Sequence, residues 1–481
     1  MNGVVHSDRE QNARLADAYD QLAYPSGVFA QTHPARLAAV ARLHGLEAPP
    51  IATARVLEIG GGDGLNAMAM AAAYPRLQAL SIDIAADVVR SGHALARSAG
   101  LDNVRVEVAD VLDAVETMDE RFDYVIAHGL YAWVPDGVRA ATMALIGRVL
   151  ANDGIAFVSY NAMPGGHVRL LLRDLVRQRI AGVGGLSDRA DAALGVLDEF
   201  AEPRDDDSIL MRGLRSQAAL MARKQPGAIG HDELSDYFAP QRLADVVAAA
   251  ARHGLAYLND AANDLLDDGF PVLSGGRQLR EDEVVAHIQN RDYDSLRFFR
   301  QSLFVRSGRL VARTFDPLRA AGLWLSTTSQ HTGGTAFVRN AVSFDVGDER
   351  LAELVSAAAS RRIALDTLAG DAERLEVVVQ LMDKNLVTLH AAPLPGVADS
   401  PRPEASALAR AQLARGDALV ARLDHAMAEI VEPGPRAFLA MLDGSRDKTA
   451  LGVAWSATSY GREVEVERAL AMVAQAPLLV A

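Results

Sequence analysis

Residues 55–66 read Arg-Val-Leu-Glu-Ile-Gly-Gly-Gly-Asp-Gly-Leu-Asn, and this stretch decides the fold of the chain. A short apolar run stops at a glycine cluster, and a helix-forming run from Ala67 to Ala73 follows at once. This order predicts a strand, a tight turn and a helix. Glycine suits such a turn because it adopts positive φ angles and lets a ligand approach the backbone. Because the free N–H groups at a helix start favour carboxylate or phosphate, we expect a nucleotide-type cofactor.

The glycine motif alone fits two kinds of cofactor. Gly62-x-Gly64-x-x-Ala67 matches the dinucleotide fingerprint, and Asp83 follows at about the distance expected of a ribose-binding acid. Read from Glu58, the same stretch is Glu-x-Gly-x-Gly-x-Gly, which resembles motif I of class I methyltransferases that use S-adenosylmethionine (SAM). The glycines therefore leave the choice of cofactor open.

The strands that follow favour SAM. Residues 104–110 alternate like a strand and end in Asp110, where those methyltransferases hold the adenine amino group. Residues 122–128 form a further strand that leads into the expected active-site loop. A glycine turn and two acids at the carboxyl ends of successive strands fit one adenosine laid across the switch point of a parallel sheet.

Residues 55–160 alternate strands with helices, which predicts βαβ crossovers and a Rossmann-like, doubly wound α/β sheet. A helix and a late strand at residues 241–258 are expected to complete this sheet. Residues 263–334 are expected to be mostly helical, and residues 337–345 to form one strand. We expect four regions: cap helices at 1–50, a SAM-binding core at 51–262 with a helical insertion at about 181–230, a helical middle domain at 263–395, and a winged-helix-like C-terminal domain at 396–481.

Composition limits the classes of function. The formal net charge of −14 argues against broad nucleic-acid binding, because phosphate contacts need a basic face. No long apolar run and no basic-plus-apolar leader is visible, so we expect no membrane span and a cytoplasmic protein. The absence of cysteine excludes disulfides and thiolate catalysis. No spacing of His, Asp and Glu predicts a metal site.

Several motifs together resemble one family. They are the glycine motif and residues 18–24, 31–37, 128–135 and 159–165, and they are similar to bacterial seven-strand protein lysine methyltransferases with a methyltransferase regulatory domain. The piece from Asn290 to Arg300 looks like the signature of that regulatory domain. The resemblance implies methyl transfer from SAM to a lysine of a protein or peptide, with S-adenosylhomocysteine as the product. The sequence departs from the pattern of this family at Gly61-Gly62-Asp63, the core of the glycine turn. This departure affects only the expected shape of the pocket around the methionine moiety of SAM.

The motifs and the resemblance together give a set of site residues. The expected cofactor-binding residues are Tyr19, Tyr24, Glu58, Gly60, Gly62, Gly64, Asn66, Asp83, Ile84, Asp110, Val111 and His128. The expected catalytic residues on the acceptor side are His128, Tyr131, Trp133, Tyr160 and Asn161.

Four of these residues have proposed roles. His128 is a general base, a neighbour of the adenine or a structural histidine. Tyr131 and Trp133 line the acceptor or simply pack. Asn161 accepts a hydrogen bond from the N–H of the nucleophile.

Other functions remain open. A tailoring methyltransferase would use the same chemistry on a small natural product or modified peptide. A non-catalytic partner protein would keep SAM as a structural or sensory ligand. An NAD-dependent oxidoreductase is disfavoured, because no hydride-transfer constellation follows the fourth strand. The C-terminal units are expected to dock an acceptor protein or to form a homodimer.

Overall fold

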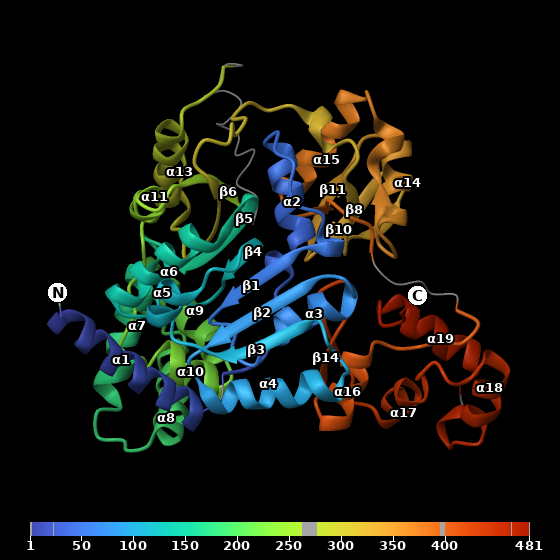
Figure 1. The fold of residues 1–481 in the computed structure, drawn as a ribbon, viewed down its shortest axis with the longest axis horizontal. Coiled ribbons are helices and arrows are strands. Elements are labelled where there is room, and N and C mark those ends of the chain that lie inside the picture. Colours follow the sequence, from blue (N-terminus) through green and yellow to red (C-terminus); the bar gives the residue numbers. More distant parts are fainter. Residues whose placement is uncertain (1, 23, 262–276, 395–399, 463, 481) are drawn as a thin grey trace.

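The computed structural model describes residues 2–22, 24–261, 277–394, 400–462 and 464–480 (Figure 1). A seven-stranded sheet forms its centre, in the order β3-β2-β1-β4-β5-β7-β6. The strands are β1 (Arg55–Ile59), β2 (Gln78–Asp83), β3 (Val104–Val108), β4 (Phe122–Ala127), β5 (Leu150–Asn161), β6 (Leu255–Asp260) and β7 (Phe299–Arg306). Strands β1 to β5 pair in parallel, whereas β7 runs antiparallel to both of its neighbours. The strand order reverses between β1 and β4, which creates the switch point.

Helices cover both faces of this sheet, because successive strand residues point to opposite sides. Val56 of β1 packs in one core with α2, α3 and α4, and Leu57 packs in the other with α5, α6, α11 and α13. The helices are α2 (Pro34–Leu43), α3 (Leu65–Ala73), α4 (Ala86–Ser98), α5 (Val111–Thr117), α6 (Asp136–Val149), α11 (Leu243–Ala251) and α13 (Glu281–Ser295). This arrangement confirms the predicted Rossmann-like methyltransferase fold.

The prediction that residues 263–334 are mostly helical was wrong, because β7 lies within them and joins the central sheet. Residues 302–305 of this strand are all buried between its two neighbours. A short apolar run of this kind has no period that separates a buried strand from a piece of buried helix. The sheet therefore extends beyond the predicted limit of the core at residue 262.

A helical group lies below the carboxyl end of the sheet. It consists of α1 (Asn2–Gln21), α7 (Gly166–Arg179), α8 (Leu186–Ala201), α9 (Ile209–Ala222) and α10 (Pro226–Asp232). Helices α7 to α10 share a core of their own, against which Leu22 packs. In Figure 1 the helix α1 crosses this group and continues toward α4. The region predicted as an insertion is helical as expected.

Two small units follow the central sheet. The first contains β8 (Trp324–Ser326), β9 (Gln330–Gly333), β10 (Ala336–Arg339), β11 (Val342–Asp345), α14 (Glu349–Ala357), β12 (Ile363–Ala364), α15 (Ala372–Asp383) and β13 (Thr388–His390). The predicted single strand over 337–345 was wrong: it is a hairpin, because Asn340 and Ala341 turn the chain with positive φ angles. The second contains α16 (Ala407–Arg415), β14 (Leu419–Ala421), β15 (Met427–Glu429), α17 (Pro433–Met441), α18 (Lys448–Ser456) and α19 (Val466–Gln475). A winged-helix arrangement stays a prediction.

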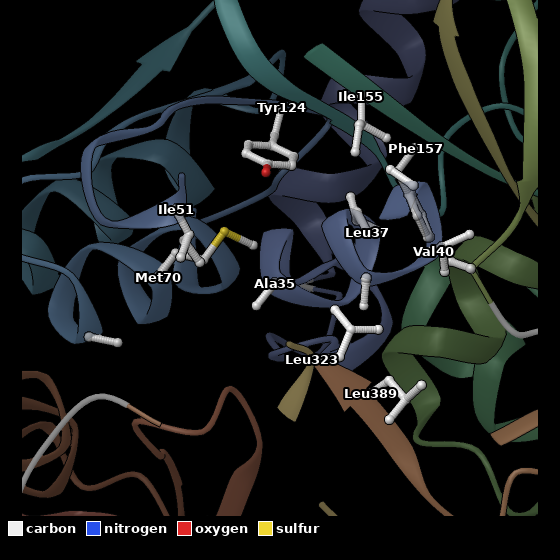
Figure 2. Close-up of a cluster of buried hydrophobic side chains, with 14 of the residues drawn as sticks. Ala35, Leu37, Val40, Ile51, Met70, Tyr124, Ile155, Phe157, Leu323 and Leu389 are labelled. Carbon is white, nitrogen blue, oxygen red and sulfur yellow. The ribbon is translucent and has the colours of Figure 1, made fainter. Parts of the chain in front are cut away.

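Helix α2 joins the central sheet to the first small unit. Figure 2 shows Leu37 and Val40 of this helix between Ile155 and Phe157 of the sheet and Leu389 of β13. The backbone N–H of Ala391 also donates to the carbonyl of Ala35, at 2.7 Å. The N-terminal cap, the sheet and the first small unit are therefore packed as one body.

Candidate functional site

A crevice of about 320 Å³ lies at the carboxyl ends of the parallel strands, beneath α1 and the segment 24–29. Twelve of the predicted site residues line it: Tyr19, Tyr24, Glu58, Gly60, Gly62, Asn66, Asp83, Ile84, Val111, His128, Trp133 and Asn161. They come from the ends of five different strands and from the N-terminal cap. The switch point thus brings together residues separated by more than one hundred positions, as predicted.

The glycine turn after β1 has no room for side chains at two positions. Gly64 precedes α3 with φ +73°, and a Cβ there would lie 2.9 Å from Val106 Cγ2. A Cβ on Gly61 would collide with Ser81 Oγ and lie 2.8 Å from Glu58 Oε2. The bare backbone of the turn consequently forms the floor of the crevice, where a ligand can approach it closely.

Glu58 is buried beneath this turn. Its Oε1 accepts a hydrogen bond from Asn66 Nδ2 at 2.7 Å, and its Oε2 has no partner among the described residues. Burial, together with the nearby carboxylates of Asp63 and Asp83, raises the pKa of Glu58 to about 7. A buried acceptor without a partner is a position that a donor group on a ligand can satisfy.

Asp83, at the end of β2, ties two loops together. Its Oδ2 accepts from the Gly62 N–H at 2.9 Å, and its Oδ1 accepts from the Ala85 N–H at 2.9 Å. Burial raises the pKa of Asp83, while the backbone donors oppose that rise. The carboxylate keeps further lone pairs on the crevice side, which suits the predicted ribose contact.

Asp110 and Gly64 do not line the crevice. The Asp110 carboxylate caps α5 by accepting from the Leu112 N–H, and it also accepts from Asn12 Nδ2 at 2.9 Å. Asn12 belongs to α1 and does line the crevice. The structure therefore gives Asp110 the observed role of fixing α1 and the start of α5.

His128 lies at the end of β4 among aromatic rings. Its ring meets that of Phe29 edge-on at 4.2 Å, and its Nδ1 lies 2.8 Å from Ser159 Oγ. Burial lowers the pKa of His128 to about 4, so its imidazole is neutral at pH 7. A histidine of such low basicity is a weak general base, although it remains able to position a neighbour.

Tyr131 and Tyr160 are buried in the core rather than along the crevice. Their rings lie 6.2 Å apart, and the Tyr160 hydroxyl shares a hydrogen bond of 3.0 Å with Ser302 Oγ of β7. The sequence placed these tyrosines at the right edge of the sheet, but it carries no signal for which way the rings point. Their observed contacts are those of packing residues.

Trp133, in the segment between β4 and α6, lines the crevice. It packs against Phe238, and the guanidinium of Arg169 lies 4.7 Å from its ring centre. Arg169 also pairs with Asp232 at 3.1 Å, and both of these residues line the crevice. The sequence analysis missed this pair because α7 and α10 are far apart in the chain.

Asn161 is the last residue of β5 and also lines the crevice. Its backbone carbonyl accepts from the Gln241 N–H at 2.8 Å. Within the described residues its side-chain amide has no hydrogen-bond partner, although the side chain is only 7% exposed. This amide is available to a ligand.

Two further contacts escaped the sequence analysis. Ser26 Oγ donates to Asp63 Oδ2 at 2.7 Å and so fastens the N-terminal cap to the glycine turn. His425, in the turn between β14 and β15, places its Nε2 2.9 Å from Asn66 Oδ1. The C-terminal unit thereby contacts the residue that holds Glu58.

Two structural features are absent from the described part of the chain. No helix there is long and apolar enough to cross a membrane. No group of three or more His, Asp or Glu side chains there is arranged to hold a metal ion.

Comparison with known families decides the class of this domain. Residues 56–154 match the family model described as a methyltransferase domain. The chain contains a methyltransferase domain. Residues 225–306 match a second model, described as a predicted methyltransferase regulatory domain. This second match covers β6 and β7, the last two strands of the methyltransferase sheet.

Two curated relatives come from Rickettsia prowazekii. The protein RP028 is 35% identical over 159 residues, which cover 33% of this chain and 63% of that protein. The protein RP789 is 27% identical over 301 residues, which cover 62% of this chain and 54% of that protein. The chain thus spans little more than half the length of these relatives.

A solved structure extends the likeness to nearly the whole chain. PKMT2 from Rickettsia typhi superposes with a TM-score of 0.79 at 20% identity, covering 95% of this chain and 100% of that protein. A second structure of PKMT2, in complex with AdoHcy, superposes equally well. At this identity the match shows a shared fold, which includes the units that follow the methyltransferase domain.

Proposed function

We propose that this chain is a SAM-dependent N-methyltransferase that acts on lysine side chains of a protein or peptide. The observation that carries the proposal is the crevice of the methyltransferase domain, where a bare glycine turn, Glu58, Asp83 and Asn161 meet. The structural neighbour solved with AdoHcy supports the choice of cofactor. The resemblance to protein lysine methyltransferases supports the choice of acceptor.

The crevice fits SAM on two observations. Glu58 Oε2 is a buried acceptor without a partner, and the turn at Gly61 excludes a Cβ. In the proposed complex Asp83 holds the ribose hydroxyls, and the turn lies against the methionine part. SAM, when bound, supplies an activated methyl group with its own leaving group, so the protein needs mainly to orient the acceptor and exclude water.

An amine acceptor must lose its proton before it can attack. A free lysine has a pKa of about 10.4, so near pH 7.4 its neutral form costs about 4 kcal/mol. The acceptor end of the crevice contains Trp133, Phe299 and the free amide of Asn161. Desolvation by the rings lowers the pKa of an entering amine, and the Asn161 carbonyl then accepts its N–H. His128, which burial keeps neutral, positions the aromatic side chains at this end of the crevice and does not act as the general base.

The later units are proposed to serve the acceptor. We propose that the middle domain and the C-terminal domain dock the acceptor protein, and that the C-terminal domain is winged-helix-like. The limits at residues 50 and 395 stay proposals, whereas the limit at 262 does not, because β7 beyond it pairs with β5 and β6 of the central sheet. The proposal also keeps a cytoplasmic location, a possible homodimer and no nucleic-acid partner.

The test uses the full chain, labelled SAM and a bacterial lysate, followed by mass spectrometry of proteins and small molecules. Labelled methyl-lysine in a protein is the expected result. A labelled small product would instead identify a tailoring methyltransferase. Calorimetric binding of S-adenosylhomocysteine without turnover on either fraction would contradict the proposal in favour of a non-catalytic partner protein.

A matched pair of variants tests the acceptor side. Asn161→Ala removes the free amide at the crevice end of β5, and we expect at least tenfold less turnover with cofactor affinity within about threefold. Asn152→Ala changes an exposed asparagine at the other end of the same strand and should leave both quantities unchanged. Equal turnover in the two variants would remove Asn161 from the acceptor site.

A further inference from the structure

Three arginines come together away from the crevice, where α2 meets the two small units. Arg36 lies on α2, Arg339 ends β10 and Arg362 precedes β12. They are close enough for Arg339 and Arg362 both to lower the pKa of Arg36, after burial, to about 10. Within the described residues none of the three forms an ion pair.

The existing contacts leave most of their donors unused. Arg362 Nη1 donates to the carbonyls of Ala392 and Pro393, at 3.1 and 3.2 Å, and Arg339 donates to the carbonyl of Asn385. The guanidinium of Arg36 makes no hydrogen bond to any described residue, and only its backbone N–H donates, to the carbonyl of His33.

The acidic residue that acts electrostatically on this arginine cluster already forms an ion pair with another arginine. Burial lowers the pKa of Arg362, and Asp424 opposes this shift through space, yet the Asp424 carboxylate is held by Arg422, with one N–O distance of 2.9 Å. The Tyr74 hydroxyl faces Arg362 as well. Although the chain carries a net charge of −14, no carboxylate of the described residues forms an ion pair with these arginines.

Three buried histidines surround the same place. His33, His390 and His425 are 2%, 6% and 1% exposed, and the rings of His33 and His425 lie 4.9 Å apart. The Nδ1 atoms of His390 and His425 have no hydrogen-bond partner among the described residues.

The opposite nitrogens of two of these rings are occupied. His390 Nε2 lies 2.8 Å from Ser326 Oγ, and His425 Nε2 lies 2.9 Å from Asn66 Oδ1. Burial lowers the pKa values of both rings, that of His425 to about 3, and a bound anion would oppose this shift by favouring the protonated ring, in which the free Nδ1 donates.

Arg362 is 7% exposed, whereas Arg36 and Arg339 are half-buried. Cations withdrawn from water without a counter-charge are costly, and an anion reduces that cost. A single carboxylate is satisfied by one guanidinium fork. Three guanidinium groups from different parts of the chain, with imidazole nitrogens beside them, suit a ligand group whose several charged oxygens point in different directions. We propose that this junction, formed by Arg36, Arg339, Arg362 and the three histidines, binds the phosphoryl group of a small soluble ligand.

The site joins parts of the chain that are distant in sequence. Arg36 and His33 come from the N-terminal cap, Arg339, Arg362 and His390 from the first small unit, and His425 from the C-terminal unit. A bound phosphoryl group would therefore stabilise the packing of all three. This proposal is independent of methyl transfer.

The test is calorimetry of inorganic phosphate with the full chain in a zwitterionic buffer, without SAM. We expect saturable binding with a dissociation constant of about 1 mM or tighter. Arg36→Gln should weaken it at least tenfold, and Arg362→Gln should do the same. Arg361→Gln changes the exposed neighbour of Arg362 and should alter it less than twofold. Binding that is absent, or equal in Arg36→Gln and Arg361→Gln, would overturn the proposal.

Thermal unfolding shows whether a variant loses phosphate binding only because it fails to fold. Without phosphate, Arg36→Gln should melt no lower than the wild type, because it removes a half-buried charge that forms no ion pair with a described residue. Phosphate should raise the melting temperature of the wild type but not of Arg36→Gln. Equal stabilisation by chloride at matched ionic strength would contradict the proposal. Titration with glycerol phosphate distinguishes two sources of the phosphoryl group. Tighter binding of glycerol phosphate than of inorganic phosphate indicates a phosphate ester as the ligand, and weaker binding indicates inorganic phosphate.

Discussion

Glu58→Gln tests the electrostatics of the cofactor turn through the stability of the ligand-free protein. The change keeps the shape of the side chain and its acceptor for Asn66 Nδ2, but it removes the buried carboxylate. The folded-state pKa of Glu58 is raised by burial from 4.5 to about 7. A raised pKa means that the folded protein binds more protons than the unfolded chain between these values. The stabilising contribution of Glu58 is therefore complete below pH 4.5 and is lost as the pH rises through 7.

The magnitude follows from the two pKa values of Glu58. A shift of one unit corresponds to about 1.36 kcal/mol, so the full contribution is about 3.4 kcal/mol. Between about pH 5.5 and about pH 8 the wild type should lose about 2 kcal/mol that the glutamine variant keeps. His33 and His128 act in the opposite direction, because burial lowers their pKa values, and their effect cancels between the two proteins.

The assay is urea unfolding of both proteins at these two pH values. The free energy of unfolding of Glu58→Gln minus that of the wild type should grow by about 2 kcal/mol from the lower to the higher pH. Glu47→Gln, at a side chain that is 90% exposed, is the control and should give a constant difference. A constant difference for Glu58→Gln as well would refute the argument that burial keeps this carboxyl protonated.

Three other outcomes are expected. Asp83→Asn should weaken S-adenosylhomocysteine binding at least tenfold by calorimetry, because a charge-assisted ribose contact contributes more than about 1.4 kcal/mol; unchanged affinity would reject that contact. Tyr160→Phe should lower the free energy of unfolding by about 1 kcal/mol through loss of the bond to Ser302, with turnover unchanged; lost turnover at unchanged stability would restore its predicted catalytic role. His425→Asn, which tolerates the left-handed backbone at this position, should weaken cofactor binding about fivefold by breaking the bond to Asn66. Unchanged cofactor affinity in that variant would show that the C-terminal unit does not support the turn.

Local patterns predicted the parallel part of the sheet well. The strands from β1 to β5 and the helices between them follow from alternating apolar periods and from the glycine turn at 60–64. The cofactor side of the crevice follows as well, because the carboxyl ends of parallel strands share one edge. Strand β7 was missed, since a strand buried on both faces has no alternation to detect.

The acceptor side was less predictable than the cofactor side. Asn161 and Trp133 line the crevice, but Tyr131 and Tyr160 point into the core from the same loops. Which way a ring points depends on the neighbours it meets. For Tyr160 that neighbour is Ser302, a residue far along the chain.

The sequence by itself determined the class of domain and the place of its cofactor crevice, because glycine turns and strand periods are local properties of the chain. Only the tertiary structure decided which partners complete that crevice. The bond from His425 to Asn66 and the junction of arginines around Arg36 join residues separated by hundreds of positions. Such contacts arise from the packing of whole units against one another, and no local period of the sequence records that packing.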